Sequence, residues 1–218
     1  MIIPLFPLPN VVLFPKTPLP LYIFEERYRT MIKDVLNGDK ELVIALLRSD
    51  HETKYSRGSA VHEIACLGRI ESHEELEDGK YNIVVVGIHR VRIIGEIQHS
   101  PYRLVEIEEL EEPEPDEQSE TVIQRQNQLG GLFARFTELA TGSKQDALQI
   151  MPQLDFESLV NIVAMTLNLT IEQKQYLLEI EDISDRCDAL IPVLQEQLEV
   201  LTLVRKFENI KPENPGLN

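Results

Sequence analysis

The N-terminal stretch of the chain, residues 1–36, decides the fold, and it reads MIIPLFPLPNVVLFPKTPLPLYIFEERYRTMIKDVL. Its first 20 residues contain six prolines, each of which lacks a backbone N–H and restricts φ, so a continuous helix is excluded there. Residues that precede prolines favour extended geometry. The apolar residues between the prolines are too dense for a solvated linker. This part of the sequence therefore predicts short, buried, extended segments with bends.

The hydrophobic period changes at Phe24. From there, apolar side chains recur at the spacing of one helix face: Phe24, Tyr28, Met31, Ile32, Val35 and Leu36. Asn37-Gly38, a common C-terminal signal, follows this pattern. We expect one amphipathic helix over residues 24–36 and a scaffolding role for the whole stretch.

Composition limits the classes of function. The 218 residues are 43% hydrophobic and 27% charged, which allows one large domain or two small ones with real cores. The net charge of −16 speaks against nucleic acid and anionic membranes as partners, because both are usually held by basic patches. Cys66 and Cys187 provide no disulfide framework, although a single bridge between them stays open. The apolar N-terminus lacks a basic region, and no apolar run approaches the roughly 20 residues that span a bilayer, so we expect a cytoplasmic protein.

The next part of the chain is rich in strand signals. Asp78-Gly79 predicts a hairpin turn, Gly68 predicts a bulge or a close approach of another segment, and Gly87 is expected to interrupt a strand. An exposed loop is expected over residues 48–59. The strands are expected at residues 42–47, 62–70, 81–86, 91–97 and 104–108. With one helix among them, these strands favour a strongly bent mixed sheet or pseudo-barrel over a βαβ array.

An acidic, proline-bearing run then marks a boundary, and the sequence beyond it becomes helical. Asp155 is predicted to cap one helix, and Thr170 with Gln173 forms the pattern of a capping box. Pro192 is expected to kink the last helix or delay its start. We therefore expect an α+β fold whose helices form an antiparallel bundle of about four members. Its parts are a β-rich domain over residues 1–112, an acidic linker over 113–120, a helical bundle over 121–210 and a frayed tail over 211–218.

Motifs of catalysis are missing from the sequence. It contains no Gly-x-x-x-x-Gly-Lys-Ser/Thr loop, no Gly-x-Gly-x-x-Gly and no Gly-x-Ser-x-Gly. Residues 62–66, His-Glu-Ile-Ala-Cys, are a near miss to a zinc-binding helix in a strand-like run. One arginine after one glycine, at residues 87–90, is too weak a signal for a phosphate site. We expect no catalytic, cofactor-binding or metal-binding residues and no enzyme activity.

Three blocks of the sequence resemble a known family. Residues 4–29, 78–91 and 169–179 are similar, in this order, to the N-terminal substrate-binding domain of ATP-dependent Lon proteases. Lys16-Thr17 departs from a small Gly-Met-like pair, and Glu26 replaces a frequent proline. The resemblance implies a PUA-like β-rich subdomain followed by a helical bundle, and recognition of protein segments. Because no ATPase or Ser-Lys protease module follows, we expect a stand-alone protein to which proteolysis does not carry over.

The leading hypothesis is a non-catalytic module that binds proteins or unfolded polypeptide segments, with a Lon-type protease as a further partner. Segments would dock in a groove between the sheet and the N-terminal stretch, or by strand addition at an exposed edge. The candidate contacts, each of which fits a core position better than a surface one, are Leu13, Phe14, Leu21, Tyr22 and Phe24. The alternatives are a small-molecule- or RNA-binding PUA-like protein and an unrecognised hydrolase.

Overall fold

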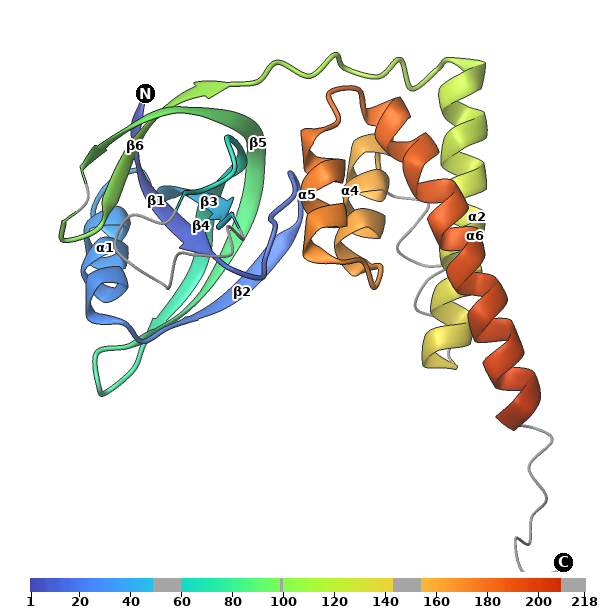
Figure 1. Ribbon diagram of the computed structural model, residues 1–218, viewed down its shortest axis with the longest axis horizontal. Coiled ribbons are helices and arrows are strands. Elements are labelled where there is room, and N and C mark those ends of the chain that lie inside the picture. The colour runs from blue at the N-terminus through green and yellow to red at the C-terminus, as the bar shows by residue number, and fades with distance from the viewer. Residues whose placement is uncertain (49–59, 99, 143–153, 209–218) are drawn as a thin grey trace, which may run out of the picture. The chain divides into compact units, whose positions relative to one another are not determined.

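The computed structural model describes residues 1–48, 60–98, 100–142 and 154–208. Two compact units make up the chain (Figure 1). Unit 1 consists of Met1–Pro113 with Ala164–Glu181, and unit 2 consists of Glu114–Val163 with Asp182–Asn218. The predicted tail, and the predicted loop apart from Arg48, lie outside the described residues.

Unit 1 is built on a mixed sheet, in which β1 and β3 are parallel and the other pairs are antiparallel. The strand order is β2-β5-β4-β3-β1-β6, and β6 also pairs with β5, so the sheet closes into a ring to which β2 is added at one side (Figure 1). This arrangement confirms the predicted α+β class with a bent sheet. The strands are β1 Ile2–Leu8, β2 Pro18–Ile23, β3 Glu41–Leu46, β4 Ile64–Glu75, β5 Tyr81–Gln98 and β6 Arg103–Glu109.

The predicted N-terminal helix is present as α1, Glu26–Leu36. It buries Tyr28, Met31, Ile32 and Val35 against apolar side chains of the sheet. The helix begins two residues later than expected, because Glu25 is the N-cap residue and has extended geometry. Phe24 therefore lies outside the helix and is exposed rather than part of its buried face.

The expected interruption at Gly87 is wrong, since β5 runs through it as one strand. The glycine instead permits a close approach by the segment that precedes β2. A Cβ at Gly87 would lie 2.1 Å from the carbonyl oxygen of Phe14. Backbone hydrogen bonds hold this contact, from Lys16 N to Gly87 O at 2.8 Å and from Gly87 N to Thr17 O at 3.1 Å. The bulge predicted at Gly68 is confirmed by a register shift between β4 and β5.

A helix from the second half of the chain, α5 (Ile171–Glu179), belongs to unit 1. The predicted capping box is confirmed, because Thr170 Oγ1 accepts from Gln173 N and Gln173 Oε1 accepts from Thr170 N. A side-chain hydrogen bond from Gln175 Nε2 to Ile64 O, 2.9 Å long, joins α5 to the start of β4.

Unit 2 contains the long helices α2 (Glu120–Thr141) and α6 (Ile183–Glu208). Arg125 pairs with Asp188 near their first turns, and Arg205 donates to Leu139 O near their last turns, so the two helices run parallel. The expected antiparallel packing is wrong for this pair, because the intervening chain returns to the starting end. α6 continues through Pro192, which does not delay its start. The helix α4 (Phe156–Thr166) begins after Asp155, whose Oδ1 accepts from Ser158 N as predicted.

Candidate functional site

A shallow groove crosses β2, β5 and β4 on the face of the sheet that points away from the core. Cross-strand pairing places two rows of side chains there, Pro20–Val84–Ser72 and Tyr22–Asn82–Glu74. Between these rows, Ile83 of β5 is buried and Leu21 of β2 is half-buried, as the period of two requires. The groove has a volume of about 500 Å³ and is lined by Pro20, Leu21, Tyr22, Ser72, His73, Glu74, Asn82, Ile83 and Val84.

An exposed aromatic pair borders the groove. Tyr22 is 52% exposed and Phe24 is 59% exposed, and their ring centroids are 6.1 Å apart. Tyr22 belongs to the outward row of β2, and Phe24 is outside the helix because Glu25 is the N-cap. Aromatic rings contribute most to binding when they become buried, so two neighbouring exposed rings indicate a contact surface.

The opposite wall of the groove is polar. Glu74 Oε2 accepts a hydrogen bond from Asn82 Nδ2 at 3.0 Å. At the hairpin end, Lys80 Nζ lies 2.6 Å from Asp78 Oδ2 and 5.9 Å from the centre of the Tyr22 ring. The hydrogen bond from Lys80 lowers the pKa of Asp78, and the same bond raises the pKa of Lys80. The groove therefore joins an apolar, aromatic side on β2 to an acidic side on β4.

The free edge of β2 is poorly suited to pair with an added strand. Pro18 and Pro20 lie in the ladder with β5, opposite Val86 and Val84. A proline nitrogen cannot donate, so prolines are accommodated where that nitrogen faces the open edge of a sheet. An incoming strand would find no donor at either position, which protects the edge from pairing. We therefore expect ligands to contact side chains on the face of the sheet rather than its edge.

The structure separates the five predicted contact residues. Leu13 and Phe14 are 0% exposed, and the carbonyl oxygen of Phe14 accepts from the buried Thr17 hydroxyl at 2.7 Å. Leu21 lines the groove and is half-buried, while Tyr22 and Phe24 are exposed beside it. Leu13 and Phe14 thus belong to the core, and the surface formed by the N-terminal stretch comes from its second part.

The groove residues contributed by β4 and β5 were not predicted. Glu74, Asn82 and Val84 lie about 50 to 60 residues beyond Tyr22 in the sequence, and only strand pairing brings them beside it. The alternation of apolar and polar residues in β5 marks Asn82 and Val84 as outward-facing, but it does not indicate which strand is their neighbour.

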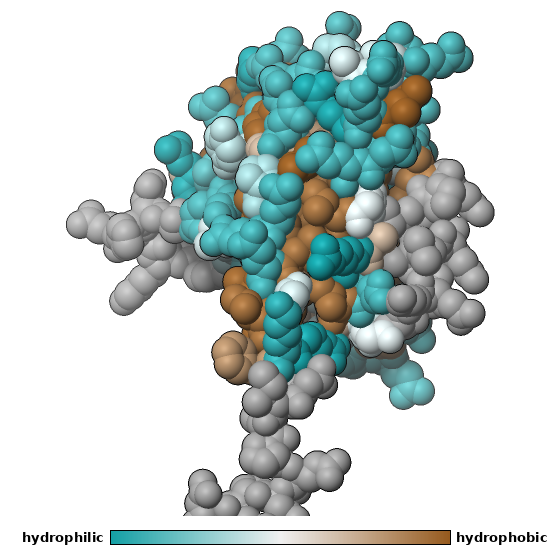
Figure 2. Space-filling view, turned by 90° about the vertical axis from the view of Figure 1, so that its right-hand side faces the viewer, coloured by the Kyte–Doolittle hydropathy of each residue, from teal (hydrophilic) through white to brown (hydrophobic). Residues whose placement is uncertain are grey.

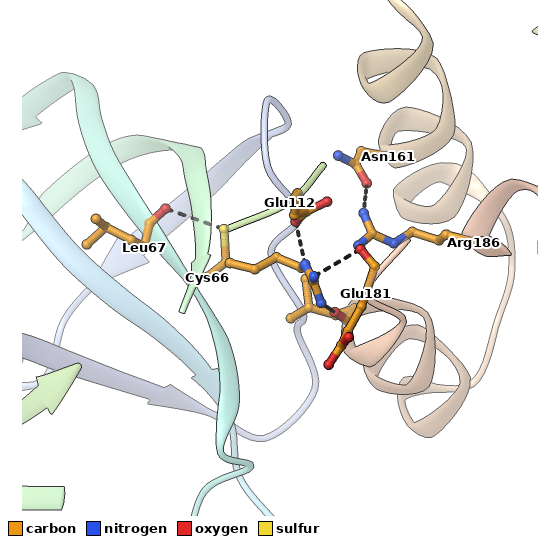
Figure 3. A network of polar contacts seen from close by, with 8 residues as sticks. Cys66, Leu67, Glu112, Asn161, Glu181 and Arg186 are labelled. Carbon is orange, nitrogen blue, oxygen red and sulfur yellow. Dashed lines mark hydrogen bonds and ion pairs between the residues drawn. The ribbon is translucent and has the colours of Figure 1, made fainter. Parts of the chain in front are cut away.

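Arg90 has a structural role, in agreement with the weak signal that residues 87–90 gave for a phosphate site. Its guanidinium is 1% exposed and pairs with Glu112, which is labelled in Figure 3. It also donates from Nη1 to Leu178 O at 2.9 Å and from Nη2 to Glu181 O at 3.2 Å. The side chain thereby binds the C-terminal end of α5, where the helix dipole favours a cation. Its N–H groups already have protein partners in Glu112, Leu178 and Glu181.

The two cysteines are free and buried, so the bridge left open by the sequence is not formed. Burial raises the pKa of the Cys187 thiol to about 12, which keeps it protonated and unreactive near neutral pH. Within the described ranges, no three His, Cys, Asp or Glu side chains are arranged to hold a metal ion. None of the described helices combines the length and apolar character that crossing a bilayer requires.

Unit 2 carries a second candidate surface, seen in Figure 2 as apolar side chains between hydrophilic ones on the α2 and α6 face. The exposed apolar residues of α6 recur at helical spacing: Val200, Leu203, Val204 and Phe207. A neighbouring hollow of about 590 Å³ is lined by Leu132, Arg135, Gln195, Leu198, Glu199, Thr202, Leu203 and Lys206. Its described lining residues include no pair of exposed rings like the one beside the groove of unit 1.

Comparison with known proteins identifies the family. The model of the ATP-dependent protease La (LON) substrate-binding domain matches residues 2–196, which is most of the chain. The chain belongs to the Lon substrate-binding domain family. This confirms the resemblance noted in the three sequence blocks.

Relatives of this Lon-type domain include Lon protease 2 of Herpetosiphon aurantiacus, which is 28% identical over 215 residues. Lon protease 1 of Bdellovibrio bacteriovorus is 29% identical over 205 residues. The alignments cover 95% and 93% of this chain but 25% and 26% of those proteins. The chain therefore spans about a quarter of the length of these relatives.

Two solved structures share the fold of the Lon-type domain. The N-terminal domain of the Mycobacterium avium complex Lon protease superposes with a TM-score of 0.71 at 18% identity, covering 89% of this chain and 98% of that one. The Lon N-terminal domain protein from Xanthomonas campestris gives a TM-score of 0.62 at 20% identity, covering 88% and 98%. At these identities the likeness concerns the fold alone.

Proposed function

We propose that this Lon-type domain recognises segments of other proteins without catalysis, and that the groove across β2, β5 and β4 holds them. The observation that carries the proposal is the exposed pair Tyr22 and Phe24 beside the groove. Membership of a family described as substrate-binding supports it. The missing nucleotide-binding and nucleophile motifs agree with a binding role rather than a catalytic one.

The groove suits unfolded or extended polypeptide because such segments expose apolar side chains that folded proteins bury. Docking such a side chain on Tyr22 and Phe24 would remove apolar surface of both partners from water, which contributes about 1–2 kcal/mol per ring. Ordering a disordered segment opposes this gain. The balance favours weak, reversible binding in roughly the micromolar range, which suits the capture of varied sequences.

RNA is the less favoured ligand. Its phosphates are usually bound by basic patches. The chain has a net charge of −16, and the polar wall of the groove contributes a carboxylate, Glu74. An RNA-binding domain would need a local cationic surface that this groove does not provide.

A direct test measures the binding of a fluorescently labelled, reduced and alkylated unfolded protein by anisotropy. We expect the Tyr22→Ala/Phe24→Ala double variant to bind at least about tenfold more weakly than the unaltered chain, as is usual for aromatic contacts at the centre of an interface. Phe207→Ala removes an even more exposed ring from α6 and serves as the matched control, with binding unchanged. Equal affinities of the unaltered chain and the double variant would contradict the proposed site.

We propose a Lon-type protease as a second partner, since the matched relatives are Lon proteases. Co-sedimentation of the purified chain with such a protease would show association. The rate at which the protease degrades an unfolded substrate would then distinguish delivery, which raises the rate, from competition, which lowers it. No association and no change in rate would remove the protease from the proposal.

A further inference from the structure

Besides the aromatic pair at the groove, the molecule has three further features that could take part in binding. The apolar face of α6 has nothing in the structure that indicates what covers it. The buried pair of Arg186 and Asn161 in unit 2 is inaccessible to a ligand. The third feature is the negative charge on the β4 side of the groove, where the carboxylate of Glu74 lines it.

The β4–β5 hairpin is strongly acidic, and one of its carboxylates, Glu74, lines the groove. Residues 71–80 place five exposed carboxylates on the end of β4 and the turn: Glu71, Glu74, Glu75, Glu77 and Asp78. Against them the same segment supplies one lysine, Lys80, and one histidine, His73. Arg29, which approaches the turn from α1, donates from Nε to Gly79 O at 2.6 Å.

The carboxylates of this hairpin differ in what they bind. Asp78 is held by Lys80, and Glu75 interacts with the phenol of Tyr81. Glu74, the carboxylate that lines the groove, accepts from a neutral amide, that of Asn82. In the described part of the chain, Glu74 is thus the groove carboxylate whose hydrogen-bond partner carries no positive charge. A cation in the groove would find an attractive site there.

The β2 side of the groove also accepts a cation. Lys80 Nζ lies 5.9 Å from the centre of the Tyr22 ring, within the range of a cation–π contact. The ring thereby holds a cation of the protein itself, and its other surface is exposed. A basic side chain of a ligand would meet a favourable environment on both sides of the groove.

From these contacts we infer that the groove selects polypeptide segments in which an aromatic or large aliphatic residue is followed closely by lysine or arginine. This inference rests on the proposed function. The apolar side chain would lie on Tyr22 and Phe24, and the basic side chain would reach Glu74. Tyr22 and Glu74 lie two strand spacings apart, about 9–10 Å, and an extended segment rises about 3.3 Å per residue. The two ligand residues are therefore separated by about two to four positions.

Three peptides of equal length test this selectivity. They share one Phe-Leu core and carry lysines, serines or glutamates two to four positions away. With the full chain, anisotropy should show the lysine peptide binding about three- to tenfold more tightly than the serine peptide, and the glutamate peptide binding most weakly. The advantage of lysine should fall as the salt concentration rises from 50 to 500 mM, roughly as screening by salt requires.

The variant Glu74→Gln distinguishes attraction of the ligand by the Glu74 carboxylate from attraction by the net negative charge of the chain. It should reduce the advantage of the lysine peptide while leaving the serine peptide unaffected. Glu106→Gln changes the same charge on β6 and is the matched control, which should leave the order of the peptides as it was. Serine and lysine peptides of equal affinity, both weakened by Tyr22→Ala, would overturn the charge selectivity but keep the proposed function. If all three peptides fail to bind, or bind regardless of Tyr22→Ala, the proposed function itself fails.

Discussion

The buried guanidinium of Arg90 pairs with the partly buried carboxylate of Glu112 in unit 1, and the same guanidinium holds two carbonyl groups at the end of α5. This arrangement joins three segments that are far apart in the sequence: β5, the chain after β6 and the residues around α5. It explains how a helix from the second half of the chain becomes part of the β-rich unit.

Replacing Arg90 should destabilise unit 1 strongly. Arg90→Met leaves the Glu112 carboxylate and two carbonyl groups without their cationic donor, and breaking a buried pair in this way costs about 3–5 kcal/mol. Hydrogen exchange of β5 amides, which reports the opening of unit 1 separately from unit 2, measures the effect. Arg125→Met removes an exposed pair with Asp188 in unit 2 and should change stability by less than about 1 kcal/mol. Equal effects of the two variants would contradict the structural role of Arg90.

Two glycines of β5 should respond oppositely to the same substitution. Gly87→Ala places a methyl group 2.1 Å from the Phe14 carbonyl oxygen, where backbone rather than a flexible side chain must move. We expect a loss of about 2–3 kcal/mol in the free energy of unfolding, typical of overpacking. Gly95→Ala meets nothing within 4 Å and should be neutral or slightly stabilising. Urea denaturation of both variants measures the difference, and a neutral Gly87→Ala would show that the close contact with the Phe14 segment is absent.

Cys187 should make the stability of unit 2 depend on pH in the alkaline range. Its folded pKa of about 12 lies above the ordinary thiol value, so the unfolded thiol ionises first. The contribution is fully present below about pH 9 and is lost as pH rises from there towards 12, with a slope of at most about 1.4 kcal/mol per pH unit. Comparing urea midpoints at pH 8 and pH 10, we expect a larger decrease for the unaltered chain than for Cys187→Ala. Parallel decreases would indicate an accessible thiol.

Local signals in the sequence predicted local structure well. Thr170 and Gln173 form the capping box, Asp155 caps α4, and Gly68 marks a bulge, because each depends on residues a few positions apart. Gly87 is a case in which the local sequence did not predict the structure correctly. A glycine in a strand is compatible with an interruption or with a close approach, and the approaching Phe14 lies 73 positions earlier in the chain.

The residues of the candidate site are brought together mainly by pairing between strands that are far apart in the sequence, and the sequence alone did not predict this pairing. The N-terminal stretch indicated an apolar surface, but its density of apolar residues could not show that Leu13 and Phe14 face the core while Tyr22 and Phe24 face solvent. The acidic wall at Glu74 follows only from the pairing of β2 with β5 and of β5 with β4. The parallel course of α2 and α6 could not be predicted either, since helical periodicity does not specify the relative direction of two packed helices.

Mapping the contact of a bound segment tests the groove most directly. An unfolded polypeptide carrying a photo-activated cross-linker is bound to the full chain, irradiated and digested, and the attached residues are identified by mass spectrometry. If the groove is the binding site, we expect cross-links at residues 20–24, 72–74 and 82–84, and an excess of unlabelled polypeptide should suppress all of them. Competed cross-links confined to the exposed apolar residues of α6, around Leu203 and Phe207, would contradict the groove as the binding site.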